Sequence, residues 1–293
     1  MGFSSLDDFV NEITVNAKFG RYDWNKVTGA SAYTAGRAYD FGSLPGSPIA
    51  NAWAGTALAW TSCNESAGNG TQIFGMPHGG NVSTDTKHLV NIMAMTMIAT
   101  GVPGTIYLLD LQGYWPGISN NLATAQTLTG TPTLRYANGA GLKLFSVATA
   151  ASGATAQNIA LSYTNQAGTS GRALGATVAM TASAIVGHIA HSGTAATNFG
   201  PFLPLAGGDS GVQNVASVTM SAANTGTFAL CLARVLAHIP ITTVGVASER
   251  DLVNQLPSMP RIMDGACIVP IFVAGAAVAA NTTFIGSHEY AWG

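Results

Sequence analysis

Apolar residues alternate with small or polar residues, at a period of two, along much of this chain. The alternation is clearest in three stretches, at residues 159–164, 228–233 and 284–292. A strand places successive side chains on opposite faces, so this period indicates strands with one buried face and excludes helices there. Gly-rich turn signals separate such stretches every 8–15 residues. The sequence therefore predicts a mainly β fold of antiparallel sandwich or jelly-roll type.

A longer repeat is superimposed on this alternation. An Arg is followed three residues later by Asp or Asn at three places: Arg37 and Asp40, Arg135 and Asn138, Arg261 and Asp264. Each such front half closes on an aromatic residue, and back halves at 88–111 and 212–236 follow the first two copies. Ala/Thr/Gly-rich sequences resemble one another by composition alone, but Arg, Asp and aromatic residues are not abundant here. We interpret the pattern as a duplication.

The repeat predicts how the chain is divided. Residues 1–36 form an N-terminal helix or arm with a connection, 37–127 a first sandwich module and 128–247 a second, related module. Residues 248–293 form a partial repeat that completes a module or reaches a neighbour. In a strand, residues i and i+3 point to opposite faces, so the Arg and the Asp or Asn of one repeat do not pair with each other. We expect the Arg to bind a neighbouring strand and the Asp/Asn-Gly to begin a turn.

One clear helix is predicted, at residues 5–16. Ser5 is a good N-cap, and Leu6, Phe9, Val10 and Ile13 form one apolar stripe. The helix either docks on its own domain or serves as an assembly arm on a neighbouring subunit. A second short helix is predicted at Ser248–Leu256.

Charged residues make up 8% of the chain, against about 25% in average usage. Large permanent interfaces lose charge from their centres, so this composition suits a subunit covered by copies of itself. The net charge of −2 comes with no basic cluster, which argues against nucleic-acid binding through a basic face. The sequence shows neither a signal peptide nor an apolar run that would span a membrane. The three cysteines match no metal-binding spacing and are expected to be buried thiols.

Enzymatic motifs are weak. Gly208-Asp209-Ser210-Gly211 resembles the nucleophile signature of chymotrypsin-like proteases, with His78 and Asp110 in the matching chain order. However, Val212 replaces the glycine that follows the signature in that family, and the sequence around His78 does not match either. His188 and His191 would diverge on a strand and have no third ligand at a suitable spacing. We therefore predict no catalytic residues, no cofactor and no metal.

The alternative to a structural role is a binding module. Trp53, Tyr114 and Trp115 could line a groove for a cell-surface glycan, as in a tail or fibre protein, although aromatic residues more often lie in a core or an interface. Binding that is lost when Trp115 is replaced would favour this hypothesis.

In general character the chain resembles virion structural proteins of tailed bacteriophages. The resemblance is carried by four stretches: MGFSSLDDFVNEI, YANGAGLKL, ERDLVNQLPSMPR and the closing EYAWG. It implies a repeated, non-catalytic virion component made in the host cytoplasm, with copies of itself and other capsid proteins as partners. Helical patterns are too few for the usual major capsid fold, so a decoration, cement or minor capsid role is expected.

Overall fold

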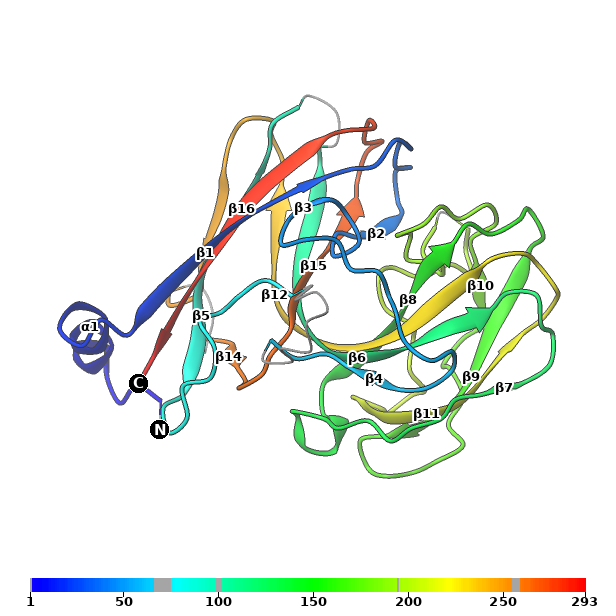
Figure 1. Ribbon diagram of the computed structural model, residues 1–293, viewed down its shortest axis with the longest axis horizontal. Coiled ribbons are helices and arrows are strands. Elements are labelled where there is room, and N and C mark those ends of the chain that lie inside the picture. Colours follow the sequence, from blue (N-terminus) through cyan, green and yellow to red (C-terminus); the bar gives the residue numbers. More distant parts are fainter. Residues whose placement is uncertain (1, 66–74, 99–101, 194, 255–258) are drawn as a thin grey trace.

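The computed structural model describes residues 2–65, 75–98, 102–193, 195–254 and 259–293. These residues form the helix α1 (Leu6–Thr14), a 3-10 turn η1 (Ala137–Gly139) and three antiparallel sheets (Figure 1). The prediction of a mainly β fold with one short N-terminal helix is confirmed. The Ser5 hydroxyl accepts the Asp8 N–H and caps α1, as its sequence predicts.

The central sheet has the order β2-β15-β6-β12-β8, with β4 paired to β6. Its strands are β2 (Ala38–Asp40), β4 (Thr61–Ser62), β6 (Gly104–Ser119), β8 (Leu142–Ala150), β12 (Thr227–Ile241) and β15 (Ile268–Ala274). The two longest, β6 and β12, pair from Gly104 opposite Ile241 to Ser119 opposite Thr227, and three register shifts interrupt the pairing. Such irregularities bend strands, and in Figure 1 both strands curve from the left-hand half of the molecule into the right-hand half.

Two outer sheets flank the central one. The first has the order β13-β5-β16-β1-β3, with β14 paired to β5. Its strands are β1 (Phe19–Val27), β3 (Gly46–Ser47), β5 (Lys87–Thr96), β13 (Ser248–Asp251), β14 (Arg261–Ile262) and β16 (Thr283–Trp292). The second has the order β10-β9-β11-β7. Its strands are β7 (Gln126–Thr127), β9 (Gln157–Asn165), β10 (Val178–Met180) and β11 (Val212–Met220).

Each outer sheet packs on one end of the central sheet and forms a sandwich with it. In the first sandwich, Ile92 and Phe284 of the outer sheet share a core with Phe272 of the central sheet. In the second, Leu161 of the outer sheet shares a core with Leu230 and Trp115. Alternate residues of β12, such as Cys231, face a third apolar cluster on the opposite side of the central sheet. The central sheet is therefore buried on both faces.

The chain does not pass through the two sandwiches in order. Residues 1–36 contain β1, which lies between β16 and β3, and are more than an arm and a connection. Residues 248–293 supply β13 to β16, all of which lie in the first sandwich or the central sheet. Divisions at residues 127 and 247 do not separate the units, because β6 and β12 contribute to both cores.

The two sandwiches share one pairing pattern. In the second, β8 pairs with β12 and β9 with β11; in the first, β15 pairs with β6 and β16 with β5. The front halves supply β8, β9, β15 and β16, and the back halves supply β5, β6, β11 and β12. Asp110 lies opposite Arg234 near the middle of the β6–β12 pairing. The register repeats as well, because Asp110 also pairs with Ile268 of β15 and Arg234 with Leu142 of β8. We call this exchange of equivalent strands around the Asp110–Arg234 pair the local twofold axis.

The predicted helix at Ser248–Leu256 is wrong over its first four residues. Ser248–Asp251 form β13 and pair with residues 91–94 of β5. The Asp251 carboxylate then accepts the N–H groups of Val253 and Asn254. Asp251 at this position caps a turn after the strand, whereas the sequence placed it in the first turn of a helix. Residues 255–256 lie outside the described residues.

Candidate functional site

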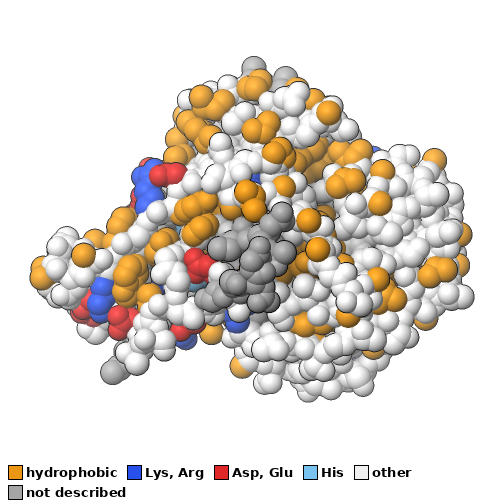
Figure 2. Space-filling model, viewed as in Figure 1, with side chains coloured by type: hydrophobic (Ala, Val, Ile, Leu, Met, Phe, Trp, Pro, Cys, Tyr) orange, Lys and Arg blue, Asp and Glu red, His pale blue; other side chains and the backbone are white. Residues whose placement is uncertain are grey.

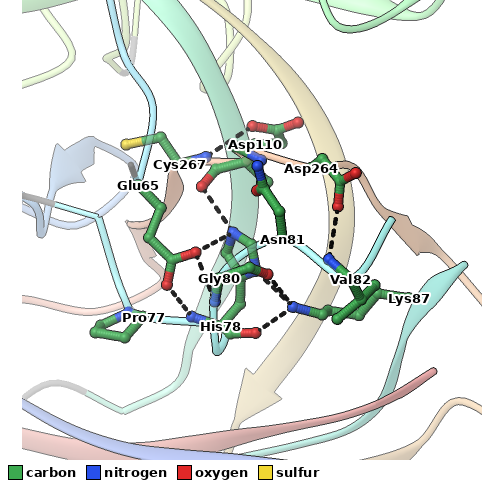
Figure 3. A network of polar contacts seen from close by, with 12 residues as sticks. Glu65, Pro77, His78, Gly80, Asn81, Val82, Lys87, Asp110, Asp264 and Cys267 are labelled. Atoms are coloured by element: carbon green, nitrogen blue, oxygen red, sulfur yellow. Dashed lines mark hydrogen bonds and ion pairs between the residues drawn. The ribbon is translucent and has the colours of Figure 1, made fainter. Parts of the chain in front are cut away.

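A buried polar network lies beside the first sandwich core, where β5 meets the loop before it and the C-terminal segment (Figure 3). Lys87 of β5 is 2% exposed, and its ammonium group donates to the carbonyl oxygens of His78, at 2.6 Å, and Gly80. It also lies over the Tyr290 ring, 5.2 Å from the centroid. Burial lowers the pKa of Lys87, and the charge of Glu65 partly opposes this shift. The lysine thus supplies the hydrogen bonds that water would otherwise donate to carbonyl groups of the irregular loop before β5.

His78 and Glu65 complete this network. The Glu65 carboxylate lies 2.8 Å from His78 Nε2 and accepts the N–H groups of His78 and Gly80. His78 Nδ1 faces the Lys87 ammonium at 3.1 Å, which assigns the ring proton to Nε2. Burial raises the pKa of Glu65, but the hydrogen bonds from His78 and the charge of Lys87 outweigh it and hold that pKa below its usual value. His78 is fully buried, and its contacts with Glu65 and Lys87 fasten the loop before β5.

Arg135 joins the second sandwich to this region. Its guanidinium is bidentate to the fully buried Asp110 carboxylate, at 2.5 and 3.2 Å. It also donates to the carbonyl oxygens of Cys63 and Leu111, and Asp110 accepts the N–H of Cys267. Because Asp110 belongs to β6, Arg135 binds a neighbouring strand, as expected for the Arg that begins a repeat.

The other repeat positions have separate surroundings. Asp40 accepts the N–H groups of Gly42 and Ser43 and begins a turn, and Asp264 accepts the N–H of Val82 from another loop. Asn138 has a φ of 55° in η1. Arg37 lines a cavity beside β9 and β10, and Arg261 lies on the surface in β14. The structure does not bring these positions together in one site.

The protease-like residues are also apart. His78 contacts Glu65 and Lys87, and Asp110 contacts Arg135. Ser210 lies in an exposed turn where its N–H binds Gln166, while the neighbouring Asp209 pairs with Arg172. These contacts do not assemble a serine–histidine–aspartate triad from His78, Asp110 and Ser210.

The histidine pair is buried and separately bonded. His191 Nδ1 lies 2.8 Å from the Ser146 hydroxyl, and His188 Nε2 lies 3.4 Å from that of Ser192. Burial lowers the pKa of each ring to about 3. Across the described parts of the chain, no three His, Cys, Asp or Glu side chains are placed to hold a metal ion. All three cysteines are buried free thiols.

The aromatic residues considered for a glycan groove are buried. Trp53 is 7% exposed and packs edge-on against Tyr114, whose hydroxyl donates to the Ala54 carbonyl oxygen. Trp115 is fully buried in the second core, and its indole N–H donates to the Thr129 carbonyl oxygen. These three side chains pack on the two faces of the central sheet, which is the more usual core placement, and they do not line a surface groove.

The surface feature that stands out is α1, at the left-hand end of the molecule in Figure 1. No residue of this helix is buried. Phe9 packs edge-on against Phe3, and Phe9 and Ile13 are half-buried on the side that faces the body. Leu6 and Val10 are 67% and 49% exposed. The apolar stripe is therefore divided, with one half on the body of the chain and the other in solvent.

The described residues contain no helix that is long and apolar enough to cross a membrane. Figure 2 shows charged side chains gathered on the first sandwich and near α1, and few on the second. On this face of the molecule the basic side chains do not form a continuous patch.

Comparison with known proteins gives little. No family model and no curated protein matches the chain. Among solved structures, the VP2 subviral particle of infectious bursal disease virus is 9% identical, with 97% of this chain and 86% of that chain covered and a TM-score of 0.19. A structure of the Gt strain of the same virus is 7% identical, with 97% and 86% covered and a TM-score of 0.16. Scores this low do not define a shared fold.

Proposed function

We propose that this chain is a non-enzymatic structural subunit of a virion. In this proposal it self-associates to build or stabilise a capsid shell, as a decoration, cement or minor capsid protein of a bacteriophage. Its partners are copies of itself and other capsid proteins, and it acts in the virion without a cofactor.

The observation that carries the proposal is the exposed apolar half of α1. A helix this short is marginal in water without tertiary contacts, and most of its stability in proteins comes from burial of an apolar face. Leu6 and Val10 gain that burial only against another molecule. An assembly arm of this kind suits a subunit that works as part of an array.

Two further features support the proposal. The titratable groups that resemble catalytic residues are buried among carbonyl groups and ion pairs, which gives them structural roles. The second sandwich also presents a surface almost without charge (Figure 2), as the centres of permanent interfaces do.

The test is the native mass of the purified chain, combined with negative-stain microscopy of the same sample. The proposal predicts a closed oligomer or a lattice, and Leu6→Ser with Val10→Ser is expected to shift it to monomer. Ser substitutions at Val15 and Val186, which are equally exposed but lie off the stripe, are the matched control. A chain that remains monomeric at high concentration and does not bind purified capsids contradicts the proposal.

A further inference from the structure

The local twofold axis places two arginine sites in equivalent positions. Arg135 and Arg261 begin equivalent repeats, and Asp110 and Arg234 lie opposite each other at the axis. The contacts follow the same relation. Asp110 accepts the N–H of Cys267, six residues after Arg261, and Arg234 donates to the carbonyl oxygen of Ala140, five residues after Arg135.

The two sites differ in one charge. Arg135 meets the carboxylate of Asp110, whereas Arg261 lies at a cavity that it shares with Arg234. The carboxylate of the first site is thus replaced by a second guanidinium. Within the described residues, the side chain of Arg261 has no hydrogen bond or ion pair, and the side chain of Arg234 contacts the Ala140 carbonyl oxygen and the face of Tyr136.

The cavity around Arg261, here the arginine pocket, has a volume of about 460 Å³. Its described lining is partly cationic and partly apolar, with no acidic side chain: Tyr136, Arg234, Val235, Leu236, Pro260, Arg261 and Met263. Two guanidinium groups that form no ion pair within the described residues lie here beside apolar surface, which suits a ligand that carries a carboxylate on an apolar body.

The arm helix has this chemistry. Asp7 lies in the first turn of α1, and it is the only acidic side chain of the described residues with neither a hydrogen bond nor an ion pair. On a helix Asp7 and Val10 are three apart and Leu6 and Val10 four apart, so they share one ridge. The exposed part of the arm therefore presents a free carboxylate beside two exposed apolar side chains.

We infer that the arginine pocket receives α1 of a second copy of this chain, with Asp7 paired to Arg261 and with Leu6 and Val10 against Val235 and Met263. The inference rests on the proposed self-association and names its contact. The arm and the pocket are different surfaces of the chain. The contact is therefore heterologous, with the arm of one chain in the pocket of the next, unless two chains exchange arms. Heterologous contacts build closed rings or open filaments, and reciprocal exchange builds a dimer.

A charge exchange tests the contact. Asp7→Arg and Arg261→Asp are each expected to weaken self-association at least about tenfold, because a desolvated charge pair is lost and like charges are opposed. The double variant restores the ion pair, with its charges exchanged, and is expected to recover to within about threefold of the parent chain. Lys143→Asp is the control, since it makes the same charge change at a half-buried lysine outside the pocket.

A second measurement is independent of affinity. Chains with Asp7→Cys are mixed with differently tagged chains with Arg261→Cys and then oxidised with glutathione disulfide. Two thiols lose their protons and two electrons to the oxidant and form one S–S bond, which yields a crosslinked pair of unlike chains. Crosslinking within either variant alone is expected to be negligible, because the three native thiols are buried.

The outcomes separate this inference from the proposed function. An assembly that forms normally in all variants, without the mixed crosslink, overturns the contact and leaves self-association in place. A parent chain that does not associate overturns both. Pocket variants that lose binding of free phosphate or acetate but keep the parent mass would show an anion site, which also overturns docking of the arm.

Discussion

The two sandwiches share a strand-pairing pattern but differ in how they use charge. Only four of the charged residues lie between Gln112 and Ala233, which spans the second sandwich: Arg135, Lys143, Arg172 and Asp209. The first sandwich buries Lys26 and Lys87 completely or nearly so, together with the carboxylate of Asp40. Charged residues are therefore scarcest in the second unit.

The difference follows from what each unit encloses. The first sandwich holds irregular chain between β2 and β5, and buried lysines donate to its carbonyls, as Lys26 does to Leu44 and Pro48 at 3.1 and 2.6 Å. The second is closed by sheets and apolar loops, and its buried polar side chains are neutral ones such as Gln126 and Asn224. Two units with the same strand pairing can therefore have an ionic or a neutral interior. The difference depends on how many buried loop carbonyl groups need a hydrogen-bond donor.

The largest effect is expected where the units meet. Arg135→Met leaves the buried Asp110 carboxylate without its cation and should lower the free energy of unfolding by about 3–5 kcal/mol, measured by urea denaturation. Arg172→Met in the second sandwich removes a cation from a partly exposed pair and should cost clearly less. Equal losses would contradict the difference between the junction and the surface of the second unit.

A smaller loss is expected from crowding within the first sandwich. A Cβ on Gly286 would lie 2.3 Å from the Trp24 indole and 2.5 Å from the Met93 carbonyl oxygen. Gly286→Ala should therefore cost about 1–3 kcal/mol of unfolding free energy. Gly207→Ala in the second unit meets no atom within 4 Å and is the control. A neutral Gly286→Ala in thermal and urea unfolding would show that β1 and β16 separate easily.

Acid should destabilise both units through buried histidines. Burial lowers the folded-state pKa of His191 to about 3 in the second unit and of His288 to about 4 in the first. Below the unfolded value of 6.5 the unfolded chain binds protons that the folded chain excludes, so stability falls with pH from 6.5 towards these values, by at most about 1.4 kcal/mol per pH unit for each ring. His191→Gln or His288→Gln should flatten the decline between pH 6.5 and 5. An unchanged slope in both variants would refute this assignment.

The smallest effect on folding is expected at the arm. Leu6→Ser removes a side chain that is 67% exposed and should change the unfolding free energy of the isolated chain by less than about 0.5 kcal/mol. The same change should weaken association. Calorimetry on dilute, monomeric protein measures the first quantity, and a loss of several kcal/mol there would show that α1 belongs to the core of its own chain.

Local features of this protein were predictable from its sequence because they depend on neighbouring residues. The alternation at residues 284–292 predicts β16, and Ser5 with its apolar stripe predicts α1, since capping and side-chain period are properties of short segments. The repeated Arg positions also predicted equivalent strands. Glu65 and Lys87 of the polar network were missed. The only available signal was that Lys87 is in phase with Leu89 on the buried face, and at a strand end this phase usually indicates a solvated lysine.

Partners distant in the chain were decided by the tertiary structure alone. The sequence shows that a face of β16 is buried, but an alternating pattern does not say what covers that face. The pairing of β15 and β16 with β6 and β5, from the opposite end of the chain, was therefore not predictable. The same reason explains the burial of Trp53 and Trp115, whose exposure depends on loops far away in the chain. Asp110 and Arg234 each look like ordinary strand residues in the sequence. Their opposition across a local twofold axis, which leaves one arginine paired and the other free, exists only in the folded molecule.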